Sequence, residues 1–141
     1  MAVYRALFRG SSSVRAARGA VVDFARTCGL SGLGLSDVES AVGEALANAA
    51  EHGGGASCEF EVTARCDRDT LVVEVADKGP GFEHWNATDF LRPLDSAPRG
   101  FGIFIMRAVM DRVEYSEGGR HLRLVKQIRT PNPREAARRE A

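Results

Sequence analysis

Three stretches of the chain repeat apolar residues at three- and four-residue steps, the period of an amphipathic helix. They cover residues 14–28, 38–52 and 103–113. Serines 11–13 offer hydroxyls that can cap the N-terminus of the first helix. Ser36-Asp37-Val38-Glu39 matches a capping box, so the second helix is predicted to begin near Ser36. The pattern therefore predicts three helices, each with one apolar face to bury.

Other stretches alternate apolar and polar residues one by one, the period of a half-buried strand. The clearest runs from Cys58 to Cys66, and a second covers residues 71–75. Residues 3–9 predict a first strand, and residues 117–119 predict the turn of a closing hairpin. No sustained period covers residues 83–98, which contain two prolines, so we expect a loop or lid there.

Composition and charge exclude some classes of partner. Lys+Arg and Asp+Glu both number 19, so the formal net charge is zero. No excess of basic charge is available to neutralise phosphates, which argues against direct nucleic-acid binding. The apolar stretches are short and broken by charges, which argues against a membrane span.

Length and composition fit one domain with a real core. The chain has 141 residues, of which 44% are hydrophobic and 27% charged. The N-terminus lacks the apolar core of a secretory signal, and the three cysteines lack the spacing of a zinc site, so we expect a cytoplasmic protein with reduced cysteines. We expect one domain over residues 1–130 and a disordered, charged and alanine-rich tail over residues 131–141.

The second helix carries a carboxylate and an amide one turn apart, in Glu44-Ala45-Leu46-Ala47-Asn48. Positions four apart share a helix face, so Glu44 and Asn48 are expected in one stripe beside the apolar face. A carboxylate there can act as a general base, and an amide oxygen suits Mg²⁺, which prefers few protein ligands plus substrate phosphates. The same residues also fit the solvent-facing side of an ordinary helix, and both interpretations stay open.

An acid stands at the end of an apolar strand, in Asp77-Lys78-Gly79-Pro80-Gly81-Phe82. Asp77 has the same parity as Val73 and Val75, which predicts that it points to the core side of the sheet. A carboxylate on that face needs hydrogen-bond donors. An adenine amino group is one, and Gly79 and Gly81 allow a ligand to approach the backbone closely. The alternative is an Asp that simply begins a glycine turn.

A Gly-x-Gly turn leads directly into the third helix, in Arg99-Gly100-Phe101-Gly102. Free N–H groups at a helix N-terminus favour an anion, and Arg99 beside them can pair with a terminal phosphate. The segment is not a P-loop, because no Gly-Lys-Ser/Thr follows. An ordinary joint between a loop and a helix would use the same residues.

In this order the three segments resemble the N, G1 and G2 boxes of the GHKL ATPase superfamily. The phrases from Glu44 to Gly53 and from Arg99 to Tyr115 resemble its small anti-sigma factor serine kinases, the RsbW/SpoIIAB-like proteins. The resemblance covers nearly the whole chain. It implies a two-layer α/β sandwich, with a mixed or antiparallel sheet under three helices, that binds ATP and Mg²⁺.

The resemblance also implies a role for each candidate residue. Glu44 would be the catalytic base, Asn48 the Mg²⁺ ligand, and Asp77 the residue that holds adenine. The remaining nucleotide-binding residues would be Gly79, Gly81, Arg99, Gly100 and Gly102. Proteins of this kind bind a sigma factor and phosphorylate a serine on an anti-sigma factor antagonist that otherwise displaces it. We therefore expect a serine-protein kinase with these two partners, and a homodimer.

Two departures from the family pattern leave other classes open. Gly53-Gly54-Gly55 follows the first motif where a bulkier residue is expected, and the lid is short. One alternative is an ATP-binding module that sequesters a partner without phosphotransfer, and another is a scaffold that binds no ligand. A histidine kinase catalytic domain is disfavoured, because 141 residues leave no room for a helical phosphoacceptor segment.

Overall fold

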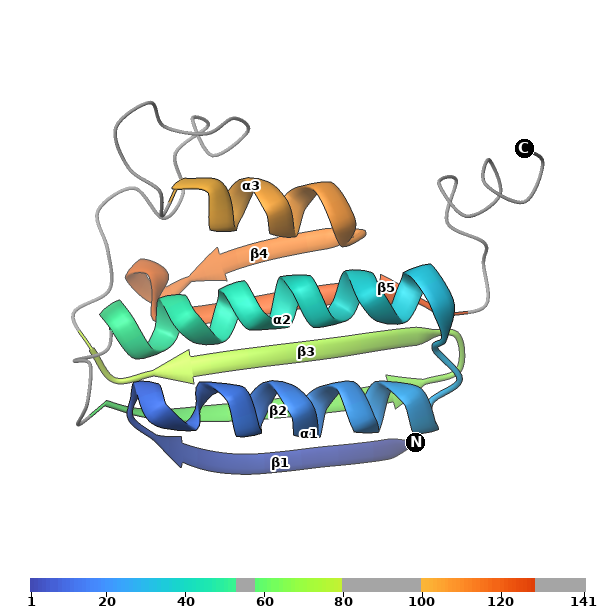
Figure 1. The fold of residues 1–141 in the computed structure, drawn as a ribbon, viewed down its shortest axis with the longest axis horizontal. Coiled ribbons are helices and arrows are strands. Elements are labelled where there is room, and N and C mark those ends of the chain that lie inside the picture. Colours follow the sequence, from blue (N-terminus) through green and yellow to red (C-terminus); the bar gives the residue numbers. More distant parts are fainter. Residues whose placement is uncertain (53–57, 80–99, 129–141) are drawn as a thin grey trace.

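The computed structural model describes residues 1–52, 58–79 and 100–128. Within these residues one five-stranded sheet is covered by three α-helices on one face (Figure 1). The predicted two-layer sandwich is therefore confirmed. In chain order the elements are β1 (Ala2–Arg9), η1 (Ser11–Ser13), α1 (Val14–Thr27), α2 (Gly32–His52), β2 (Glu59–Asp67), β3 (Thr70–Asp77), α3 (Gly100–Val109), β4 (Arg112–Ser116), η4 (Glu117–Gly119) and β5 (His121–Gln127).

The strands lie in the order β1-β2-β3-β5-β4, and each neighbouring pair is antiparallel. Of the two kinds of sheet expected, the described strands thus form the antiparallel one. β3 lies at the centre, where Val75 pairs with Leu122 of β5. This central place brings the end of β3 next to β5, which begins more than forty residues later in the sequence.

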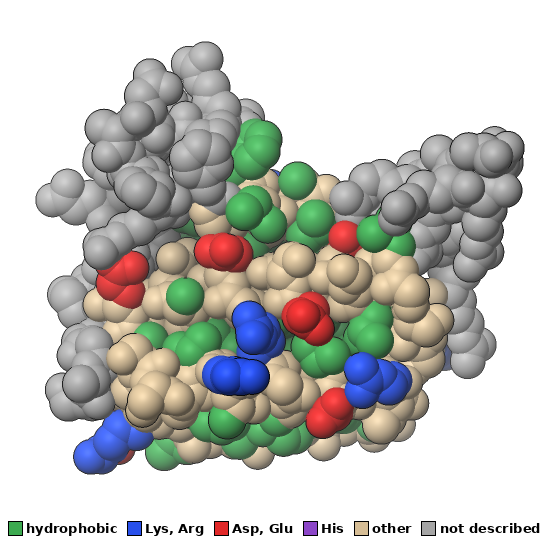
Figure 2. Space-filling view, viewed as in Figure 1, with side chains coloured by type: hydrophobic (Ala, Val, Ile, Leu, Met, Phe, Trp, Pro, Cys, Tyr) green, Lys and Arg blue, Asp and Glu red, His purple; other side chains and the backbone are tan. Residues whose placement is uncertain are grey.

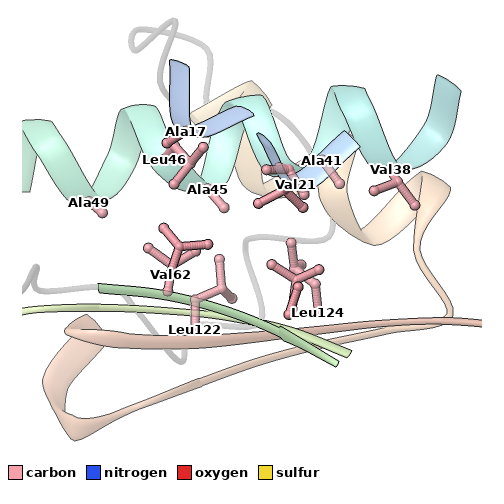
Figure 3. Packing of buried hydrophobic residues seen from close by; sticks show 14 of the residues in the cluster. Ala17, Val21, Val38, Ala41, Ala45, Leu46, Ala49, Val62, Leu122 and Leu124 are labelled. Carbon is pink, nitrogen blue, oxygen red and sulfur yellow. The ribbon is translucent and has the colours of Figure 1, made fainter. Parts of the chain in front are cut away.

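The core lies between the sheet and the helices. Figure 3 shows apolar side chains of α1 and α2 pointing towards those that rise from the sheet. Small residues on α2 let this helix pack close to the strands, and the alternation predicted for β2 and β3 places their apolar residues on the covered face. Fully buried members include Val21, Val38, Val42, Leu46, Val62, Leu71, Val73, Met106 and Leu124.

The helix starts differ from the sequence prediction. α2 begins at Gly32, and the Leu35 N–H already donates to the Ser31 carbonyl (3.3 Å), so the prediction of a start near Ser36 is wrong. Leu35 packs against the core, which extends the apolar stripe by one turn and outweighs the local capping signal. α1 has no side-chain cap either, because the Ser13 hydroxyl donates to the Gly10 carbonyl (2.8 Å).

The third helix is shorter than its apolar period predicts. α3 ends at Val109, and Val113 belongs to β4, where it pairs with Leu124. The chain leaves the helix because the Asp111 N–H donates to the Val125 carbonyl (3.0 Å), which starts the pairing with β5. An apolar residue three positions after the helix, such as Val113, fits either a longer helix or the start of a strand. Pairing with the free edge of β5 favours the strand.

Several predictions concern residues outside the described ranges. The triple glycine, the expected lid over residues 83–98 and the expected tail from residue 131 all lie there. Among the helices that the structure describes, none is both long and apolar enough to cross a membrane.

Candidate functional site

A small pocket lies where α2 passes over the ends of β3, β4 and β5. Asn48 from α2, Asp77 from β3 and Tyr115 from β4 line it together, beside the apolar side chains of Val75 and Leu122. Two residues from separate sequence motifs, Asn48 and Asp77, are therefore brought to one place. The pocket combines apolar walls with a few convergent polar groups, as small-molecule sites commonly do.

Asn48 is more buried than its expected place beside the apolar face of the helix suggests. Its exposed fraction is 9%, because β4 brings Tyr115 alongside this part of α2. The side-chain amide nitrogen donates to the Tyr115 hydroxyl at 3.4 Å. Its amide oxygen accepts no hydrogen bond from the residues that the structure describes, so it is available to a cation or water.

Asp77 is the last residue of β3 and also begins a turn. Its carboxylate accepts a hydrogen bond from the Gly79 N–H (2.8 Å), and its own N–H donates to the Arg120 carbonyl (2.9 Å). The predicted glycine turn is thus present, and the adenine role stays a prediction. The carboxylate stabilises the glycine turn and lines the pocket with Asn48.

Tyr115 was not predicted as a site residue. Its pKa is raised to about 12, mainly by burial; the hydrogen bond from Asn48 and the charge of Arg107 act against this rise, and the charge of Asp77 adds to it. The hydroxyl therefore stays protonated at neutral pH. The predicted closing hairpin implies a strand before residues 117–119, but nothing in the sequence indicates that this strand lies beside Asn48.

Glu44 faces a different space from Asn48. It lines a larger groove of about 320 Å³ on the outer side of the helix layer, with Arg18 from α1, Glu39 from α2 and Ile105 from α3. Figure 2 shows acidic and basic side chains next to one another on this helical face. The expected single stripe is therefore divided, because residues four apart on a helix differ by about 40° in direction.

Gly102 lies directly against Glu44. A Cβ atom on Gly102 would come within 2.7 Å of the Glu44 Oε2 atom, so a side chain at this position would have to displace the carboxylate. Within the described part of the chain, Glu44 forms no hydrogen bond or ion pair. The carboxylate therefore lies beside the N-terminal turn of α3 without a partner among the described residues.

The other candidate residues lie around these two spaces or outside the described ranges. Gly79 forms the turn after β3, and Gly100 is the first residue of α3. Gly81 and Arg99 lie outside the described residues. The described residues include no group of three or more His, Cys, Asp or Glu side chains that could hold a metal ion.

Comparison with known proteins agrees with this arrangement. The model of the histidine kinase-like ATPase domain matches residues 11–126, from the short helix η1 to the last strand. The chain therefore belongs to the family of histidine kinase-like ATPase domains.

Among curated proteins, the chain is similar to the serine-protein kinase RsbW of Bacillus pumilus (strain SAFR-032), with 32% identity over 91 residues. That match covers 57% of this chain and 56% of the relative, so the chain spans about half the length of the curated protein it matches. The resemblance to RsbW-like proteins that the motifs indicate is thus confirmed.

Proposed function

We propose that the protein binds Mg-ATP and transfers its terminal phosphoryl group to a serine hydroxyl of a partner protein. The observation that carries this proposal is the convergence of Asn48 and Asp77 in one pocket, while Glu44 lies beside the N-terminal turn of α3. In the proposed role the protein is an anti-sigma factor that sequesters a sigma factor as a homodimer. The serine acceptor is an anti-sigma factor antagonist.

The donor set supports Mg²⁺ as the metal. Mg²⁺ binds one or two protein oxygens and completes its shell with phosphates and water. The Asn48 amide oxygen is such a ligand, and the described residues lack the larger acidic or thiolate cluster that a different metal would prefer. When bound, the metal would neutralise charge on the phosphates.

Each part of the nucleotide has a proposed neighbour. The Asp77 carboxylate accepts hydrogen bonds from the adenine amino group, and the turn at Gly79 and Gly81 lets the base approach the backbone. The phosphates would lie near the first turn of α3, whose backbone N–H groups have no acceptor within the helix and whose Gly100 and Gly102 carry no side chain. Arg99, just before this turn, pairs with the terminal phosphate.

Glu44 is the proposed general base. Its carboxylate takes the proton from the incoming serine hydroxyl as the oxygen attacks the terminal phosphoryl group. The groove of about 320 Å³ beside it gives an extended segment of the partner access to this carboxylate. Glu44 has no basic partner among the described residues, so none of them neutralises its charge.

Phosphotransfer with labelled ATP tests the proposal. The purified chain is incubated with its copurifying antagonist, and the wild type is compared with Glu44→Gln and with a matched control, Glu39→Gln, from the same groove. Glu44→Gln should keep ATP and partner binding but lower transfer by roughly 10²–10⁴-fold, whereas Glu39→Gln should keep transfer. No transfer by the wild type would favour a module that binds ATP and only sequesters its partner. Equal transfer by all three would exclude Glu44 as the base.

A further inference from the structure

The hydroxyl of Tyr115 makes a contact that the sequence alone does not indicate. It comes from β4, near the end of the chain, and meets the side-chain amide of Asn48 on α2. This contact is the only side-chain hydrogen bond of Asn48 among the described residues. At 3.4 Å it is longer than the usual 2.9–3.0 Å, so its direct contribution to stability is small. The contact matters because it can fix the direction in which the Asn48 amide points.

A carboxamide has two different ends. Its nitrogen only donates hydrogen bonds and its oxygen only accepts them, and a half-turn of the terminal torsion exchanges the two. Mg²⁺ binds the oxygen and is repelled by the NH₂ group. A neighbour that holds the nitrogen therefore decides whether Asn48 can act as a metal ligand.

The surroundings of Tyr115 favour the orientation in which its hydroxyl accepts. A tyrosine hydroxyl can donate or accept. The Asp77 carboxylate lines the same pocket, and its negative charge attracts the hydroxyl hydrogen and leaves the oxygen lone pairs for Asn48.

We propose that Tyr115 is a positioning residue whose hydroxyl holds the Asn48 carboxamide with its nitrogen towards β4 and its oxygen towards the metal–nucleotide complex. The proposal rests on the proposed function, since it assumes that Asn48 ligates Mg²⁺. It adds a third residue to the pocket, one that acts through Asn48 without touching the metal.

Tyr115→Phe removes the hydroxyl and nothing else. The matched control is Tyr4→Phe, because Tyr4 is the only other tyrosine and packs against Phe24 at the opposite edge of the sheet, with ring centroids 6.3 Å apart. ATP affinity is measured by calorimetry in Mg²⁺ and again in EDTA. We expect Tyr115→Phe to weaken binding about three- to tenfold in Mg²⁺, with little change in EDTA. Tyr4→Phe should match the wild type in both.

Repeating the comparison in an Asn48→Asp variant shows whether Tyr115 orients the side chain of residue 48 or only packs against it. Asn48→Asp places an oxygen at both ends of the group, so its orientation no longer matters for metal binding. In this background Tyr115→Phe should have no further effect on the ratio of ATP affinities with and without Mg²⁺. The same further loss in both backgrounds would overturn the proposal, even if the phenylalanine variant proves less stable.

The outcomes distinguish this inference from the proposed function. A wild type that binds Mg-ATP, with an unchanged Tyr115→Phe variant, would overturn the role of Tyr115 alone. An equal loss in Mg²⁺ and in EDTA would also overturn it, because the hydroxyl would then serve the nucleotide directly. A wild type that binds no nucleotide under either condition would overturn the proposed function, and the inference with it.

Discussion

Glu44 and Gly102 approach each other so closely that a Cβ atom on the glycine would lie 2.7 Å from the Glu44 Oε2 atom. No protein contact of this kind survives at that distance, so a substitution at Gly102 must displace something. The displaced group is the end of a flexible side chain, which can move without disturbing the backbone. The second glycine of the Gly-x-Gly turn therefore leaves room for the proposed base.

Gly102→Ala should keep the fold and impair phosphotransfer. The added methyl group displaces the Glu44 carboxylate, and a misplacement of about 1 Å can slow a reaction by about 10²-fold. Gly19→Ala is the control, since a Cβ there meets nothing within 4 Å and Ala favours the helix. Transfer from labelled ATP and the melting temperature are measured together. Full activity of Gly102→Ala would show that the carboxylate position is not critical.

Asp77→Asn should lower ATP affinity by tenfold or more, on the order of 1.4 kcal/mol, as measured by calorimetry. The new side chain keeps an oxygen that can accept from the Gly79 N–H, so the turn should survive and only the charge is lost. Asp23→Asn, at an exposed position on α1, is the control. Unchanged affinity in a folded Asp77→Asn variant would exclude the adenine role.

Lys126→Met should destabilise the protein far more than the loss of a surface ion pair does. The Lys126 Nζ atom lies 3.1 Å from Asp37 Oδ2 and donates to the Val109 carbonyl at 2.7 Å, with both charged side chains buried. Removing the cation leaves a buried carboxylate, which lowers the free energy of unfolding by about 3–5 kcal/mol. Urea denaturation measures the loss.

Arg5→Met is the matched control for the buried pair. Arg5 and Glu61 form an exposed ion pair at 3.0 Å on the open face of the sheet. Exposed pairs contribute less than about 1 kcal/mol. If Lys126→Met and Arg5→Met give similar losses, the buried pair does not hold α2, α3 and β5 together as the distances indicate.

Cys28 should react slowly with iodoacetamide at pH 8. Burial and a hydrogen bond with Cys66 raise its pKa to about 11, against an ordinary 9.0. Its thiolate fraction falls about a hundredfold, and the higher nucleophilicity of a more basic thiolate recovers about tenfold, so labelling should be roughly tenfold slower than for a free thiol. Mass spectrometry of labelled peptides measures the rate, and Cys66→Ala should speed it.

The raised pKa of Cys28 also predicts how the stability of the protein changes with pH. The folded state holds the Cys28 proton more tightly than the unfolded chain does, so its contribution is complete below pH 9 and is lost as the pH rises towards about 11. Unfolding measured across this range should show less stability at the alkaline end. Labelling as fast as that of a free thiol at pH 8 would contradict both expectations.

The periodicity of the chain predicts most of the fold, and the errors lie where two structures compete for the same residues. Val113 continues the apolar period of α3 but pairs in β4, because the free edge of β5 attracts the chain. Ser36 offers a helix cap, but packing of Leu35 starts the helix earlier. Local signals predict the kind of element, whereas tertiary contacts fix its ends.

The sequence predicts several residues of the candidate site, but not how the fold arranges them. Asn48 and Asp77 stand in recognisable motifs, and the structure places both in one pocket. Tyr115 ends a phrase that resembles the family, but its contact with Asn48 exists only once β4 lies beside α2, so its place in the site could not be predicted. Helical spacing could not show that Glu44 faces another groove, because the packing of α3 divides the two sides.

Because β3 lies at the centre of the sheet, the pocket can form only after β5 has been synthesised and has paired with β3. All three sequence motifs are complete by Met106, but the backbone of Asp77 is held by the Arg120 carbonyl at 2.9 Å, and β3 pairs with β5 across more than forty residues. Such distant pairings make folding slow. A chain still emerging from the ribosome would thus carry every motif and yet bind no nucleotide until its last strand joins the sheet.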